Sequence, residues 1–267
     1  MRRTSLVLVF TIGLFSFGSC AATDHTASDL SSQVEIPPLV VASDLNNMPF
    51  AGLDAGGTPI GRDVEMMEAI AAALGRPIRW HRAEFETLLP SAQGGWPDVV
   101  CATIGITEER ARKVAFSRPY FETEIAIVVR TGEGEPRNWN DLEGLVVAAA
   151  PGTTSEQAVR DKLPRTQASS WTDTQGLGAA ERLLLGEIDG IAMDGPNAEA
   201  LVSDSGGALT TLHAALAPER YALVVPPNRT ALLAEINAAL LELEQSGQSQ
   251  RLNGKWGLRP TTISSDS

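Results

Sequence analysis

The chain has 267 residues, 43% of them hydrophobic and 20% charged, and a formal net charge of −12. This length allows two compact lobes or one large domain with a sizeable core, and the acidic surface argues against nucleic-acid partners. The sequence has no G-x-S-x-G, P-loop or C-x-x-C pattern, and its histidines (His25, His81 and His213) lie outside any metal-ligand spacing. We therefore expect neither a metal nor a cofactor.

The first 20 residues have the pattern of a secretory signal. Two arginines precede an apolar run over residues 6–17, which is too short to span a bilayer as a stable helix. The sequence FGSC at positions 17–20 is typical of a lipobox, so Cys20 is predicted to be lipidated and to become the mature first residue. The alternative is a simple signal cleaved after Ala22. We expect a periplasmic or cell-surface protein whose only contact with the membrane is its lipid anchor.

The segments that flank the folded body are polar. Residues 21–37 lack a hydrophobic period, which predicts a flexible tether, and residues 260–267 are expected to form a disordered tail. Lipidation of Cys20 would exclude an internal disulfide, because Cys101 is the one other cysteine in the sequence. Since Cys101 stands in an apolar run, it is predicted to be a buried core thiol.

Between the tether and the tail, apolar runs of strand length alternate with longer amphipathic segments. This alternation is typical of an α/β sheet with helical crossovers. The segment 63–74 is the clearest helix, since its apolar residues share one face and Gly75 follows it. In chain order, the patterns predict strands at 39–42, 78–81, 99–104, 120–129, 145–150, 190–193 and 221–225, and helices at 63–74, 85–93, from about 107, 155–162, 174–185, 196–202 and 232–244.

Two of these strands have the properties of connectors between lobes. One lies near 125–130 and the other near 221–225. A second lobe inserted into a discontinuous first lobe needs two such connections, one leaving the first lobe and one returning to it. We therefore predict a lobe 1 made of residues 38–128 and 223–259, and a lobe 2 made of residues 129–222.

Ligands of open α/β sheets lie beyond the carboxyl ends of strands, where helix N-termini supply free N–H groups. In the first such place, Gly105 lets the backbone approach a ligand and Thr107 can cap a helix whose first turn holds Arg110. A guanidinium in this position can hold a carboxylate. The alternative is that Arg110 pairs with Glu108 or Glu109 on an exposed helix.

Two further strand ends carry polar side chains. Thr153 and Glu156 have the spacing of a capping box, so the turn before them is either a simple helix cap or an anion site to which Thr154 adds a hydroxyl. Asp194 follows a buried strand and either binds an ammonium group or caps the next helix. One cation, two hydroxyl groups and one carboxylate together predict a receptor for a zwitterion.

The order of these segments resembles a known family from about residue 39 to residue 258. GITEER at 105–110 and VAFSRPY at 114–120 are similar to the patterns G-x-T-x-x-R and V-x-F-S-x-P-Y of the extracellular solute-binding proteins of family 3, the amino-acid-binding components of ABC importers. The resemblance implies a two-lobed α/β fold of the periplasmic-binding-protein class (type II). It also implies a monomer that closes on a small amino acid or carboxylate, docks on importer membrane subunits and performs no catalysis.

The resemblance also implies roles for individual residues. Arg110 would bind the ligand α-carboxylate with help from the Gly105 backbone, and Asp194 would bind the α-ammonium group. Thr153 and Thr154 would approach the ligand from the other lobe. The remaining cleft positions expected from it are Asp44, Asn47, Phe50, Phe85 and Thr103.

Two of these positions depart from the family pattern. Asn47 stands where a stacking Tyr or Phe is common, and Gly105 stands where a Ser or Thr hydroxyl usually joins the carboxylate clamp. The segments 45–50 and 194–196 resemble relatives that accompany periplasmic quinoprotein dehydrogenases, so an accessory protein of such an enzyme is one alternative.

A second alternative is a periplasmic enzyme similar to cyclohexadienyl dehydratase. Such an enzyme needs a general acid over the substrate ring. Glu84, Glu86 and Glu122 are available for that role, although no motif singles any of them out.

Overall fold

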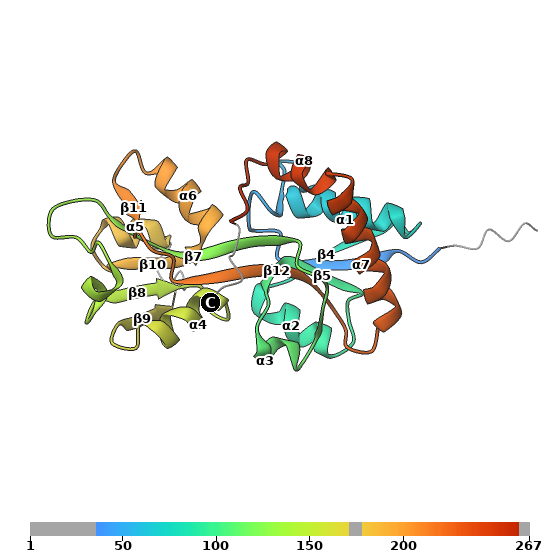
Figure 1. Cartoon of the computed structure of the whole chain (residues 1–267), viewed down its shortest axis with the longest axis horizontal. Coiled ribbons are helices and arrows are strands. Elements are labelled where there is room, and N and C mark those ends of the chain that lie inside the picture. Colours follow the sequence, from blue (N-terminus) through green and yellow to red (C-terminus); the bar gives the residue numbers. More distant parts are fainter. Residues whose placement is uncertain (1–35, 171–177, 262–267) are drawn as a thin grey trace, which may run out of the picture. The chain divides into compact units, whose positions relative to one another are not determined.

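The computed structural model describes residues 36–170 and 178–261 (Figure 1). The predicted signal with Cys20, most of the predicted tether and the end of the predicted tail lie outside the described residues, as does part of the helix predicted at 174–185. Within the described ranges, no helix is long and apolar enough to cross a membrane.

One large mixed sheet organises the described chain. Its strands run in the order β4-β1-β5-β12-β7-β10-β8-β9, with β6 beside β12 and β11 beside β7, while β2 and β3 pair separately. The strand bounds are β1 (Leu39–Ser43), β2 (Gly52–Leu53), β3 (Pro59–Ile60), β4 (Ile78–Arg82), β5 (Val99–Gly105), β6 (Ala115–Phe116), β7 (Phe121–Arg130), β8 (Val146–Ala149), β9 (Gln167–Ser170), β10 (Gly190–Asp194), β11 (Leu209–Thr211) and β12 (Ala217–Val225).

Helices join most of the parallel strands, as the alternating pattern predicts. They begin at sequence signals such as Thr107 and Thr153, whose hydroxyls accept a hydrogen bond from the backbone N–H three residues later. The helix bounds are α1 (Arg62–Ala73), α2 (Phe85–Gln93), α3 (Glu108–Ala111), α4 (Thr154–Lys162), α5 (Ala179–Leu184), α6 (Gly195–Asp204), α7 (Thr230–Gln245) and α8 (Gln248–Lys255), with a 3-10 turn at Trp139–Leu142.

Two long antiparallel strands, β7 and β12, occupy the middle of the sheet (Figure 1). On one side of them are β5, β1 and β4 with α1, α2, α3, α7 and α8, which we call lobe 1. On the other are β10, β8 and β9 with α4, α5 and α6, which we call lobe 2. The two connecting strands predicted from the sequence are thus present, although β12 begins at Ala217, four residues before the predicted start. The lobe boundaries 38–128, 223–259 and 129–222 stay a prediction.

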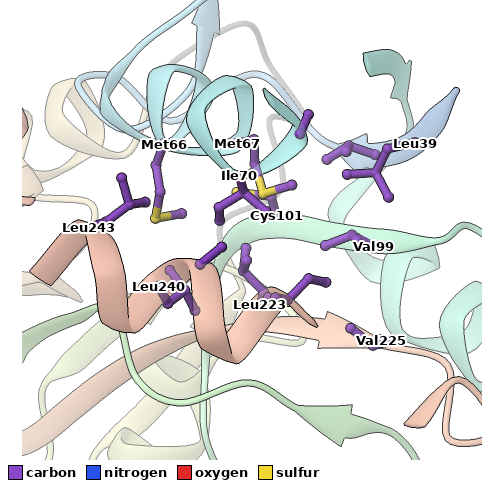
Figure 2. Packing of buried hydrophobic residues seen from close by; sticks show 14 of the residues in the cluster. Leu39, Met66, Met67, Ile70, Val99, Cys101, Leu223, Val225, Leu240 and Leu243 are labelled. Carbon is purple, nitrogen blue, oxygen red and sulfur yellow. The ribbon is translucent and has the colours of Figure 1, made fainter. Parts of the chain in front are cut away.

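Each lobe has its own hydrophobic core. In lobe 1, Met67 and Ile70 of α1 and Leu240 of α7 pack around Val99 and Leu223 of the sheet (Figure 2). The Cys101 side chain is fully buried in the same core, as predicted. In lobe 2, two further clusters pack α4, α5 and α6 against the sheet. Each lobe therefore buries its own apolar surface.

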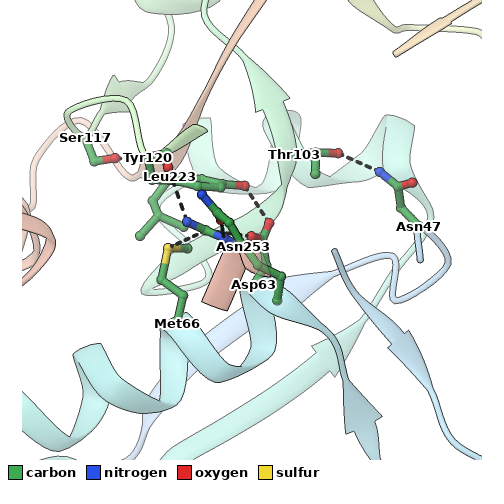
Figure 3. A network of polar contacts seen from close by, with 9 residues as sticks. Asn47, Asp63, Met66, Thr103, Ser117, Tyr120, Leu223 and Asn253 are labelled. Atoms are coloured by element: carbon green, nitrogen blue, oxygen red, sulfur yellow. Dashed lines mark hydrogen bonds and ion pairs between the residues drawn. The ribbon is translucent and has the colours of Figure 1, made fainter. Parts of the chain in front are cut away.

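A buried polar network fixes the junction between lobe 1 and β7 (Figure 3). Arg62 and Asp63, at the start of α1, are both fully buried and form an ion pair of 3.0 Å. Arg62 Nε also donates to Asn253 Oδ1 of α8 at 3.0 Å, and the Tyr120 hydroxyl donates to Asp63 Oδ2 at 2.6 Å. Because Tyr120 directly precedes β7, this network holds the first connecting strand in place.

Candidate functional site

A cleft of about 360 Å³ lies where the carboxyl ends of β1, β5 and β10 meet the N-termini of α2 and α4. This is the position in which open α/β sheets bind ligands. Most of the residues predicted from the sequence line it. The described lining consists of Asp44, Asn46, Asn47, Phe85, Glu86, Thr103, Arg110, Ala150, Pro151, Thr153, Thr154, Ser155, Ala192, Met193, Asp194 and Asn197.

Arg110 projects into the cleft from the short helix α3. Its guanidinium donates to the carbonyl oxygen of Gly105 at 2.7 Å and to that of Gly152, in lobe 2, at 2.9 Å. Among the described residues, Arg110 forms no ion pair with Glu108 or Glu109, and Glu109 pairs instead with Lys113 at 2.7 Å. Burial lowers the pKa of Arg110, and the nearby carboxyl groups oppose that shift. The guanidinium is therefore available for a carboxylate.

The N-terminus of α4 forms the opposite wall. The Thr153 hydroxyl accepts from the backbone N–H of Glu156 at 3.2 Å, and the Glu156 carboxylate accepts from the backbone N–H of Gly152 at 2.9 Å. The turn is thus a capped helix, and Thr153 and Thr154 still line the cleft. The capping interpretation is therefore confirmed, whereas the anion site stays a prediction.

Asp194 ends β10 inside the cleft. Its carboxylate accepts a hydrogen bond from the Tyr221 hydroxyl at 2.5 Å and a longer one from the Ser155 hydroxyl at 3.4 Å. The side chain makes no capping hydrogen bond to α6, so the capping alternative is wrong. Burial raises the pKa of Asp194, and the hydrogen bond from Tyr221 opposes that rise. The site thus contains a buried carboxyl group that can receive an ammonium group.

Glu219 lies behind the cleft lining, in contact with Thr154, and sequence reasoning missed it. It lies on β12, is 5% exposed, and accepts a hydrogen bond from the Thr154 hydroxyl. A Cβ atom placed on Gly105 would overlap Glu219 Oε1, so the glutamate fills the space that a larger residue at position 105 would need. Burial, together with the charge of Asp194, raises the pKa of Glu219 well above its ordinary value.

The region after β1 supplies two more polar groups. Asp44 Oδ1 is buried and has no hydrogen-bond donor among the described residues, and burial raises the pKa of this carboxyl group. Asn47 donates to Thr103 Oγ1 at 2.9 Å (Figure 3) and accepts from Asn197 Nδ2 at 2.7 Å. Thr103 has a φ of 47°, a strained conformation that is concentrated at functional sites.

Two sequence expectations need correction. Phe50 does not line the cleft: its side chain is fully buried and packs edge-to-face against Phe121 at 5.1 Å and Tyr221 at 5.5 Å between ring centroids. It belongs to the core beneath the connecting strands. Gly105 contributes its carbonyl oxygen to Arg110, but it is absent from the described cleft lining. Phe85, by contrast, does line the cleft.

The described cleft lining has more acidic than basic side chains. Among its described lining residues, Arg110 is the sole cation, whereas Asp44, Glu86 and Asp194 carry carboxyl groups. Within the described ranges, no group of three or more His, Cys, Asp or Glu side chains is placed to hold a metal ion. The arrangement favours a ligand that brings positive charge.

Comparisons with known proteins agree with this architecture. Residues 39–259 match the model of the bacterial extracellular solute-binding proteins, family 3. The L-cystine-binding protein TcyJ of Escherichia coli (strain K12) is 27% identical over 96% of this chain and 96% of its own length.

Two of the solved structures that share the fold are ancestral proteins. An ancestral arginine-binding protein bound to arginine has a TM-score of 0.74 and 31% identity, covering 83% of this chain and 99% of that one. The ancestral amino acid-binding protein AncCDT-1, a precursor of cyclohexadienyl dehydratase, has a TM-score of 0.73 and 26% identity, covering 82% and 95%. These similarities confirm the predicted type II periplasmic-binding-protein fold. The chain therefore belongs to the bacterial extracellular solute-binding proteins of family 3.

Proposed function

We propose that this protein is the extracytoplasmic binding protein of an ABC importer and that its ligand is an amino acid with a positively charged side chain. The observation that carries the proposal is Asp44, whose Oδ1 atom is buried without a donor and whose side chain lines the cleft. A buried carboxylate oxygen without a donor costs free energy, so a cationic group of the ligand at this place stabilises the complex.

The rest of the cleft fits the common part of an amino acid. In this proposal Arg110 binds the α-carboxylate, and the N-terminus of α4, where Thr153 and Thr154 line the cleft, faces it from the opposite side. The buried carboxyl group of Asp194 binds the α-ammonium group in the same proposal. A ligand held in this way directs its side chain to the remaining carboxyl groups, Asp44 and Glu86.

Closure of the two lobes completes the site. Arg110 donates to Gly152 across the cleft, and Asn197 donates to Asn47, so contacts between the lobes exist on two sides of the binding space. A ligand that contacts both lobes stabilises the closed form by the difference in its affinity for the open and closed states. The importer membrane subunits would then recognise the closed form.

The comparisons support an amino-acid ligand, and the arginine-bound structure agrees with a positively charged side chain. One solved structure with the same fold is that of an arginine-binding protein bound to arginine, and the curated relative described above is an L-cystine-binding protein. The enzyme and accessory-protein alternatives have less support. Of the three candidate general acids, Glu86 lines the cleft, whereas Glu84 and Glu122 do not.

The predicted location and state of the protein belong to the same proposal. Export by residues 1–20, anchoring through lipid on Cys20 and a monomeric receptor suit a protein that delivers a ligand to a membrane complex. Labelling with a radioactive fatty acid tests the anchor, with Cys20→Ser as the matched variant.

A thermal-shift screen tests the function. The purified protein is heated with each common amino acid and with small carboxylates. A ligand at about one hundred times its dissociation constant adds about 2.7 kcal/mol to the free energy of unfolding. The proposal expects the largest shifts with L-arginine and L-lysine. Shifts confined to neutral amino acids would contradict the ligand class, and no shift with any amino acid would contradict the function.

A further inference from the structure

Glu219 is a buried carboxyl group that the amino-acid site described above does not need. One of its oxygens, Oε1, accepts from the Thr154 hydroxyl, whereas Oε2 is buried and has no donor among the described residues. The side chain fills the space beside Gly105, where the family pattern usually has a hydroxyl-bearing residue. Such a carboxyl group costs free energy in its ionised form unless something nearby compensates its charge.

The nearest acidic neighbour of Glu219 is Asp194. Successive residues of α4 contact the two groups: the Thr154 hydroxyl donates to Glu219 and the Ser155 hydroxyl donates to Asp194. The two carboxyl groups therefore lie close together, and one proton held by the pair relieves the repulsion between two buried negative charges. The proton belongs on Glu219, because Asp194 already receives hydrogen bonds from Tyr221 and Ser155 and is therefore the better stabilised anion. Burial first, and the charge of Asp194 second, raise the pKa of Glu219, whose titration is thus linked to that of its neighbour.

The other groups around this pair are few. Arg110 approaches from α3 and favours a negative charge on both carboxyl groups. Tyr221, on the same strand as Glu219, donates to Asp194. On the packed neighbours, the β7 residue opposite Glu219 is Thr123, which is uncharged, and Gly105 of β5 lies beside the Glu219 side chain.

We propose that Glu219 and Asp194 hold one proton between them in the ligand-free protein and release it to solvent when the α-ammonium group of the ligand binds, so that affinity rises with pH. The inference rests on the proposed function for the arrival of an ammonium group at Asp194. The ammonium group then compensates the negative charge that the shared proton compensated before. Both carboxyl groups are ionised in the complex, and they face Arg110 and the ammonium group. Glu219 is thereby a positioning residue for Asp194, and it sets the pH range in which the receptor binds its ligand.

Isothermal titration calorimetry measures the released proton directly. L-arginine is titrated into the protein at pH 6.5 in two buffers with different ionisation enthalpies, and the difference in heat gives the number of protons released. The dissociation constant is also measured between pH 5.5 and 7.5. If a full proton is released, the dissociation constant falls by up to about tenfold for each unit by which the pH rises. The Glu219→Gln variant, which has nearly the same shape and no proton to release, is expected to bind with buffer-independent heat and a flat pH profile.

A matched control and a ligand-free measurement separate the possible failures. Glu122→Gln, on the neighbouring strand, is expected to keep the proton release of the wild type. Since the fold raises the pKa of Glu219, its contribution to stability is present at low pH and is lost as pH rises through the folded-state pKa. Without ligand, the melting temperature of Glu219→Gln minus that of the wild type is therefore expected to become more positive from pH 5 to pH 8.

Each outcome decides one claim. Arginine binding by the wild type with no proton release and a flat pH profile overturns the shared proton and leaves the proposed function intact, whether or not the variant folds. A constant gap between the two melting temperatures also overturns it. Absence of arginine binding at every pH counts against the proposed ligand class and not against the shared proton, which the ligand-free melting temperatures test separately.

Discussion

The Arg110 guanidinium donates a hydrogen bond of 2.9 Å to the carbonyl oxygen of Gly152, across the cleft between the two lobes. The same guanidinium also donates to the carbonyl of Gly105 in its own lobe, at 2.7 Å. One side chain thus joins the carboxyl end of β5 to the turn before α4. A ligand carboxylate beside Arg110 would strengthen the link between the lobes, since a charged acceptor binds a guanidinium more tightly than a carbonyl does.

Arg110→Ala is therefore expected to weaken ligand binding by about 2–5 kcal/mol, because the ligand carboxylate and Asp194 would be buried without a balancing cation. Calorimetric titration with L-arginine measures the loss. Arg112→Ala, which removes an exposed charge at the end of the same helix, is the matched control and should bind as the parent does. Equal affinity of Arg110→Ala and the parent would mean that the site is assigned wrongly.

The Asp44 carboxyl group gives a prediction about specificity. Asp44→Asn should weaken binding of L-arginine by about 1.5–3 kcal/mol, the usual value of a hydrogen bond to a charged group. Binding of L-glutamine, if measurable, should change little, because its side chain carries no charge for Asp44 to pair with. The control is Glu68→Gln, an exposed position on α1. Equal losses for both ligands would assign Asp44 a purely structural role.

Gly105 and Glu219 compete for the same space. Gly105→Ala is expected to destabilise the fold by about 1–3 kcal/mol, because the new Cβ would overlap Glu219 Oε1. Chemical denaturation of both single variants and of Gly105→Ala with Glu219→Ala gives a double-mutant cycle. The second substitution should recover part of the loss. Additive effects would show that the two positions do not interact.

The buried ion pair of Arg62 and Asp63 gives a prediction about stability alone. Asp63→Ala would leave the Arg62 charge buried without its partner, which typically costs about 3–5 kcal/mol. Thermal unfolding in the absence of ligand measures it. Glu109→Gln, which removes one partner of an exposed pair, should leave the melting temperature nearly unchanged. A similar small effect at Asp63 would mean that the network relaxes around the loss.

Much of the fold follows from the sequence because its elements have strong apolar patterns. The helices α1 and α7 and the strands β5, β7 and β10 begin and end within a few residues of their predicted bounds. The elements that sequence reasoning did not find are polar or very short. The strand β9 reads QASS, β11 has three residues, and α8 reads QSQRLNGK, so none of them has an apolar period to detect.

The site was partly predictable for a similar reason. Arg110, Thr153 and Asp194 each follow a recognisable strand, and such strand ends converge in a parallel sheet. Glu219 was missed because its importance depends on a long-range contact with Gly105, which no local pattern records. Phe50 was placed in the cleft by its order in the chain, yet it packs into an aromatic cluster with Phe121 and Tyr221. Its surroundings are set by the connecting strands, which are distant in sequence.

The most direct test of the central claim compares two ligands of nearly the same shape. L-citrulline differs from L-arginine by a neutral urea group in place of the guanidinium. Calorimetric titration of the purified protein should give an affinity for L-arginine at least about tenfold higher, since a charged hydrogen bond to Asp44 contributes about 1.5–3 kcal/mol. Equal affinities, or tighter binding of L-citrulline, would contradict a site built for a positively charged side chain.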